Sequence, residues 1–342
     1  MTGRRQIAGR ARRLAATGVL GLLGTALPGL AATGPWSIEN EARVRLISGW
    51  RAAPAGAGEL DLGVEFELAP DWHVYWKNSG DAGYAPRIDF GTSATIRDAR
   101  LLYPAPHRFD LPGGLVSFGY ERSVIYPVAG EWLGSPDGAA TIAGRIDYLV
   151  CASECVPYTA DLELPLPAAG AEAGVNVEPL DAGRLAAARD QVPRAPESVA
   201  EAPAIRLVAL ASDAHGATLE LRAENGNFLA ASPELFFETH PFFALGRPEL
   251  RIGASGIRYR IPIRALDETK PRPSQSEFAW TLTGLDGRNG KYALEGRSTV
   301  TFPTAVRIGR SAWIVAALLV ASAVGFWFRT RRNSSRQPVL EV

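Results

Sequence analysis

The chain has 342 residues, with 36 basic and 36 acidic side chains and hence no formal net charge. This balance argues against a polyanion-binding protein, whose domains usually carry a basic excess. Glycine (35 residues) and proline (25) are abundant, and 46% of the residues are apolar, which predicts a turn-rich protein with a sizeable core.

Residues 1–32 predict an export signal peptide. The first 13 positions contain five arginines and no acidic residue, and the apolar run "LAATGVLGLLGTALPGLAA" with its small residues follows. We expect the general export route, with a twin-arginine signal at Arg4 and Arg5 as the alternative. The cysteines that follow would then reside in an oxidising compartment.

Residues 36–168 predict a first β-sandwich. In "LDLGVEFEL" (60–68) apolar side chains alternate with Asp61, Glu65 and Glu67, and "DLELPL" (161–166) repeats the pattern. Period-two alternation in short runs broken by turn residues is typical of antiparallel sandwich sheets. We interpret Glu65 and Glu67 as part of a solvated strand face.

Aromatic residues gather in two turn-rich stretches of this region. "DWHVYWKNSGDAGYAP" (71–86) contains Tyr75, and "GGLVSFGYERSVIYPV" (113–128) places Phe118 and Tyr120 on either side of a glycine. Exposed aromatics at a hairpin tip can shield a reactive disulfide, and the alternative is that these rings are ordinary core residues of a sandwich. The sequence leaves both interpretations open.

The stretch "YLVCASECVPY" (148–158) holds the only two cysteines, Cys151 and Cys155. Strand-like segments flank it, so the pair is predicted at the turn of a hairpin at the end of the sandwich, and Pro157 is expected to hinder pairing beyond it. A disulfide here closes a loop of about five residues and would stabilise the fold by only ~2 kcal/mol. We therefore favour a redox-active pair over a purely structural disulfide.

A metal site is the third interpretation of the cysteines. A structural zinc site needs four nitrogen or sulfur ligands, whereas this chain offers two thiols, four scattered histidines and no second cysteine pair. Copper(I) is the ion that two thiolates would suit best. No glycine-rich phosphate loop occurs. We expect no cofactor and no resident metal, with copper(I) handling kept as an alternative.

The remaining segments predict a linker, a second sandwich and a membrane anchor. Residues 169–203 are rich in alanine, proline and glycine, and "LDAGRLAAARDQ" within them could form a short helix. Strand alternation returns in residues 204–303. The uncharged run 311–328, roughly 27 Å long as a helix, predicts one transmembrane helix, and the arginines of 329–342 place this tail in the cytoplasm.

Taken together, the stretches "WHVYWKNSGDAGYAP", "YPAPHRF", "FGYERSVIYPV" and "YLVCASECVPYTADLELPL" resemble the N-terminal periplasmic domain of the DsbD/ScsB family of thiol:disulfide interchange proteins. "PELFFETHPFFALGRPE" with "IRYRIPI" resembles the second immunoglobulin-like domain of the ScsB branch. The resemblance implies an all-β protein with two immunoglobulin-like β-sandwiches in tandem, followed by a single C-terminal transmembrane helix in the bacterial inner membrane.

The resemblance also implies roles for individual residues. Cys151 and Cys155 match the redox-active pair, with Cys155 the more exposed. Phe118 and Tyr120 match the aromatic cap loop over it, and Tyr75 matches an aromatic that positions the site.

The family's polytopic electron-conducting domain and thioredoxin-like domain have no counterpart in this sequence. The resemblance therefore implies a separate membrane dithiol protein, similar to the DsbD central domain or CcdA, as electron donor. It implies periplasmic thioredoxin-like partners downstream, such as disulfide isomerases, cytochrome c maturation factors or peroxide-reducing proteins.

Overall fold

The computed structural model describes residues 31–302, except 92, 172–176, 179–180, 213–215, 227–231, 271–272 and 288–289. The expected signal peptide up to residue 30, the expected transmembrane run 311–328 and the tail 329–342 lie outside this part. Among the described residues, no helix is long and apolar enough to cross a membrane. Residues at the expected end of the signal peptide form β1 (Ala31–Ala32), which pairs with β14 (Val177–Glu178).

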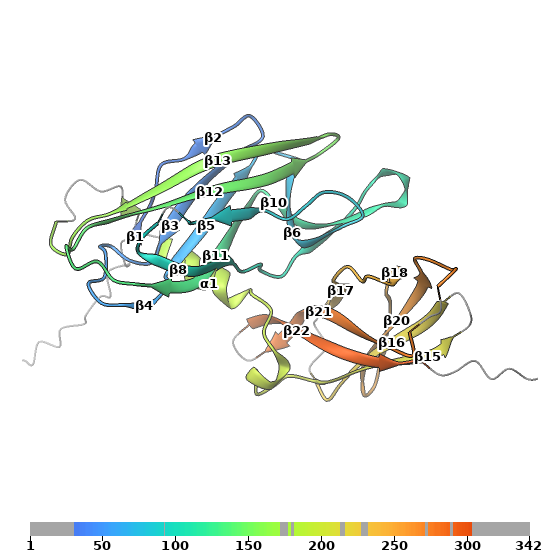
Figure 1. The fold of residues 1–342 in the computed structure, drawn as a ribbon. Coiled ribbons are helices and arrows are strands. Elements are labelled where there is room, and N and C mark those ends of the chain that lie inside the picture. The colour runs from blue at the N-terminus through green and yellow to red at the C-terminus, as the bar shows by residue number, and fades with distance from the viewer. Residues whose placement is uncertain are drawn as a thin grey trace, which may run out of the picture.

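The described chain is mostly β-structure, as the alternation predicts, and it forms two β-sandwiches (Figure 1). In the first sandwich, one sheet contains β6 (His73–Gly80), β7 (Arg87–Asp89), β9 (His107–Asp110), β10 (Val116–Glu121), β12 (Ala140–Cys151) and β13 (Cys155–Leu166). Its order is β13-β12-β6-β10-β9, with β7 also on β12. A short 3-10 turn, η1 (Pro112–Gly114), connects β9 to β10.

The facing sheet contains β2 (Ser37–Ile38), β3 (Ala42–Ser48), β4 (Gly58–Glu59), β5 (Leu62–Leu68), β8 (Ile96–Leu101) and β11 (Ser123–Trp132). Its order is β2-β3-β5-β11-β4, with β8 on β11. The alternating apolar residues of both sheets meet between them, where Val64, Phe66, Trp76, Tyr126 and Ile146 are fully buried. Burial of this shared face is the main stabilisation of the sandwich.

The second sandwich also consists of two sheets that bury their apolar residues between them. One sheet contains β15 (Ala204–Ser212), β16 (Gly216–Glu224), β18 (Phe243–Leu245), β19 (Glu249–Gly253) and β20 (Gly256–Ala265). The other contains β17 (Glu234–Phe237), β21 (Gln275–Gly287) and β22 (Gly290–Thr301). A 3-10 turn, η2 (Pro196–Ser198), precedes them.

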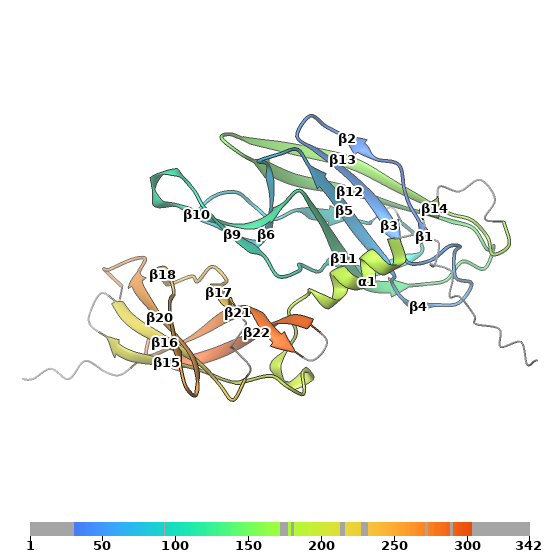
Figure 2. The same ribbon diagram turned by 180° about the vertical axis from the view of Figure 1, so that it is seen from behind.

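The expected linker contains one helix, α1 (Asp181–Asp190). It lies against β11 and β3 on the outer face of the first sandwich (Figure 2). Leu185 and Ala188 pack there on Ile47 and Ile125. Helix α1 is therefore packed on the first sandwich and does not lie free between the two.

The helix also corrects the interpretation of the acidic strand face. Glu65 is fully buried, because α1 covers it and brings Arg184 to one carboxylate oxygen, while Arg45 Nε donates to the other at 2.7 Å. Glu67, two residues on, keeps 37% of its side chain exposed and pairs with Arg43. The prediction of a solvated face was thus wrong for Glu65.

The two sandwiches contact each other directly. Phe236 of β17 is only 2% exposed and packs against the rings of Trp76 and Phe118 in the first sandwich, with centroids 5.8 and 5.0 Å apart. Lys77 Nζ lies 2.7 Å from Glu295 and 2.9 Å from Glu238. A cleft of about 580 Å³ opens beside this contact.

Candidate functional site

The two cysteines join β12 to β13 at the tip of their hairpin. The antiparallel register pairs residue 140 with 166 and runs to Cys151 opposite Cys155, and the two form a disulfide. Within the turn, Ala152 N–H donates to Glu154 O at 2.9 Å. Pairing also continues through Pro157, contrary to expectation, because β13 is an edge strand, where a proline is tolerated.

The two sulfurs lie in unlike environments. Cys151 is 2% exposed and packs with Tyr75 and Leu149 on the outer face of its sheet, whereas Cys155 is exposed. The turn beside Cys155 consists of small or polar residues, and Ser153 and Glu154 are themselves exposed. Cys155 is therefore the cysteine that presents surface to solvent or to a partner protein.

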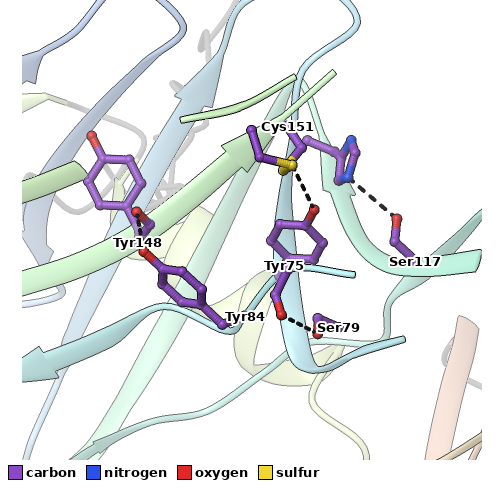
Figure 3. The surroundings of a disulfide bond; sticks show 9 residues. Tyr75, Ser79, Tyr84, Ser117, Tyr148 and Cys151 are labelled. Atoms are coloured by element: carbon purple, nitrogen blue, oxygen red, sulfur yellow. Dashed lines mark hydrogen bonds between the residues drawn. A yellow bond between two sulfur atoms is a disulfide. The ribbon is translucent and has the colours of Figure 1, made fainter. Parts of the chain in front are cut away.

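Tyr75 is the aromatic residue that meets the disulfide. Its hydroxyl lies 3.9 Å from Cys155 Sγ (Figure 3). The side chain is fully buried, and burial raises the pKa of its phenol, which therefore stays protonated and able to donate. Its backbone carbonyl accepts a 2.7 Å hydrogen bond from the Tyr126 hydroxyl in the core, which fixes this point of β6.

The structure adds three residues to the site that sequence reasoning did not single out: His73, Ser117 and Phe109. His73 on β6 lies directly opposite Cys151 on β12 and is 5% exposed. Its Nε2 lies 3.4 Å from Ser117 Oγ of β10, and its ring stacks on Phe109 of β9 at 5.0 Å. Burial lowers the pKa of His73, and Glu121 opposes this shift.

The pattern of "WHVYW" contained the signal for His73. Residues two apart on a strand share one face, so His73 and Tyr75 had to lie together wherever β6 places them. The pattern does not reveal which strand pairs with β6. Pairing with β12 brings Cys151 to the face that carries His73 and Tyr75.

Phe118 and Tyr120 do not lie over the cysteines, so the cap expected from them needs correction. The register pairs Gly119 with Tyr75, which places the two flanking aromatics on the opposite face of the sheet. Tyr120 is 5% exposed, and its hydroxyl donates to Pro104 O at 2.7 Å. Phe118 packs on Phe236 and lines the cleft between the sandwiches. Strand alternation therefore places both rings on the face opposite the disulfide, where Phe118 contacts the second sandwich.

In the described part of the chain, no group of three or more histidine, cysteine, aspartate or glutamate side chains could hold a metal ion. His215, one of the four histidines weighed for a zinc site, lies outside the described residues.

Residues 43–167 match the sequence family described as "Thiol:disulfide interchange protein DsbD, N-terminal". Among solved structures, the crystal structure of the N-terminal periplasmic domain of ScsB from Proteus mirabilis aligns with a TM-score of 0.60 and 19% identity, over 80% of this chain and all of that one. At this identity the likeness shows the fold alone. The CupB6 tip adhesin from Pseudomonas aeruginosa aligns at a TM-score of only 0.15 and carries no argument. No curated protein sequence matches the chain.

Proposed function

We propose that this protein exchanges electrons with other proteins through the Cys151–Cys155 disulfide, because residues 43–167 match the N-terminal domain of DsbD and contain this pair. The observation that carries the proposal is the asymmetry of the pair, with Cys155 exposed at a hairpin tip and Cys151 buried beside it. A purely structural disulfide would not need an accessible sulfur, whereas exchange does.

The exchange begins with attack of a partner thiolate on Cys155 Sγ. A partner–Cys155 disulfide forms, the Cys151–Cys155 bond breaks, and its electron pair leaves on Cys151. The partner's second thiol then attacks its own half of the mixed disulfide and releases Cys155. The pair ends reduced by two electrons, and the partner ends with a disulfide.

Tyr75 positions and stabilises the exposed sulfur in this scheme. Its protonated phenol lies 3.9 Å from Cys155 Sγ and can donate to that sulfur when it carries negative charge. Its burial and the hydrogen bond from Tyr126 keep the ring in place before the reaction starts.

The cysteine count supports a need for partner proteins. The chain has one cysteine pair, so each reduction needs electrons from another dithiol. We propose a polytopic membrane dithiol protein as donor and periplasmic thioredoxin-like proteins as acceptors. The expected signal peptide and the apolar run 311–328 support a periplasmic protein with two immunoglobulin-like sandwiches, held at the inner membrane by one helix.

Two single-cysteine variants test the proposal in intact cells. Cys151→Ala retains the exposed thiol and should accumulate a mixed disulfide with a partner on non-reducing gels. Cys155→Ala, the matched control, retains only the buried thiol and should trap much less. If neither variant traps any protein, the disulfide is structural and the protein is a binding module.

The copper alternative has its own measurement. The reduced wild-type protein, titrated with copper(I) against a competing chelator, should bind no stoichiometric copper at sub-nanomolar affinity if exchange is its role. Tight stoichiometric binding that both cysteine variants abolish would favour copper handling instead.

A further inference from the structure

The two cysteines of the disulfide belong to a row of four residues that runs across neighbouring strands. The registers pair Cys155 with Cys151, Cys151 with His73, and His73 with Glu121, across β13, β12, β6 and β10. Directly opposite residues share one face, with β-carbons about 5 Å apart. The two inner members, Cys151 and His73, are 2% and 5% exposed, and the two outer members are exposed.

This row presents a chemical problem at Cys151. In the proposed exchange, the electron pair of the broken disulfide leaves on a buried sulfur, where a thiolate is costly because little water reaches it. The thiolate must gain a proton, and in the reverse step the thiol must lose one. His73 is the titratable residue paired directly with Cys151 on the neighbouring strand.

We propose that His73 is the proton-exchange partner of Cys151. The inference rests on the proposed thiol exchange and extends it to the second sulfur. When the disulfide opens, His73 takes up a proton from solvent at the Glu121 end of the row and passes it to the Cys151 thiolate. When Cys151 next attacks the disulfide between Cys155 and a downstream partner, neutral His73 accepts the thiol proton.

The surroundings of His73 suit this exchange. Ser117 Oγ at 3.4 Å holds Nε2, and Phe109 and Tyr75 pack on the ring, with centroids 5.0 and 5.1 Å away. Glu121 is the charged group that acts on it, and it favours the protonated ring, while burial favours the neutral ring. Burial is the larger of the two effects, so the pKa of His73 lies below its ordinary value and the ring rests neutral, able to accept the Cys151 thiol proton.

The test measures the reactivity of Cys151 alone. In a full-length Cys155→Ala parent, the rate of alkylation by iodoacetamide is followed from mildly acidic to alkaline pH. Adding His73→Phe should move the midpoint of this profile to higher pH, and alkylation at neutral pH should fall about tenfold for each pH unit by which the midpoint rises. His73→Gln, which keeps polarity without titrating, guards against a packing defect and should also move the midpoint upward. Glu121→Gln should move it less, in the same direction.

Tyr158→Phe is the matched control, because it removes a hydroxyl of the same sandwich that bonds to Glu41 and not to either cysteine. It should leave the midpoint of the Cys151 profile unchanged. A purely structural role of His73 would scale the alkylation rate equally at every pH, and an unchanged midpoint in both His73 variants would overturn the proposal. Because the reagent is a small molecule, this outcome is independent of whether any partner protein is trapped.

Discussion

At the scale of single residues, Gly83 controls the position of Tyr75. A Cβ added at this glycine would lie 2.1 Å from Tyr75 Cζ, and its φ of +87° already disfavours other residues. We expect Gly83→Ala to lower the free energy of unfolding by about 1–3 kcal/mol beyond the backbone penalty, because the ring must move. It should also change the rate at which Cys155 reacts with a small thiol.

Gly113→Ala is the control for this substitution, since its φ is +81° and a Cβ there would meet nothing within 4 Å. Urea unfolding of both variants separates the two contributions, provided that the m-value stays constant. Equal losses of stability in the two variants would show that contact with Tyr75 does not matter.

The residues of the site differ in how far the sequence could predict them. Cys151, Cys155 and Tyr75 could be found because their residue types and motifs are distinctive. Whether Phe118 faces the disulfide or the core depends on the register of β10 against β6, and shifting a strand by one residue moves every side chain to the other face. The sequence does not encode that register locally.

At the scale of elements, the buried ion pairs under α1 make a sharp prediction. Glu65→Ala removes the fully buried carboxylate that Arg45 and Arg184 both contact, and we expect a loss of about 3–5 kcal/mol in the free energy of unfolding. Glu67→Ala, on the same strand face, breaks an exposed pair with Arg43 and should cost below about 1 kcal/mol. Chemical denaturation measures both, and similar losses would contradict the assignment.

The strands themselves followed from the sequence, because half-buried strands alternate visibly. In β20 the apolar residues Ile257, Tyr259, Ile261 and Ile263 are all nearly or fully buried, as the period of two predicts. The burial of Glu65 did not follow, since its cover comes from a helix more than 100 residues later in the chain. Alternation reveals that a strand has two faces but not what packs on the polar one.

At the scale of the whole molecule, the second sandwich supports the strand that carries the site. His73 and Tyr75 lie on the outer face of β6, while Trp76 and Lys77 of the same strand contact residues of the second sandwich. Although burial opposes the charge of Lys77, its hydrogen bonds to Glu295 and Glu238 raise its pKa, so this bridge stays charged at neutral pH. β6 thus couples the two sandwiches, together with Phe118 of β10.

This coupling predicts how the protein unfolds. Phe236→Ala removes the ring that the second sandwich inserts against Trp76 and Phe118, and large-to-small changes of this kind cost about 3–5 kcal/mol. We expect the wild type to unfold in one calorimetric transition and the variant in two, because the sandwiches then melt separately. Phe242→Ala, whose side chain is 53% exposed on the second sandwich, should retain the single transition. A Phe236→Ala variant that melts in one step at the wild-type temperature would show that the sandwiches are not coupled through this ring.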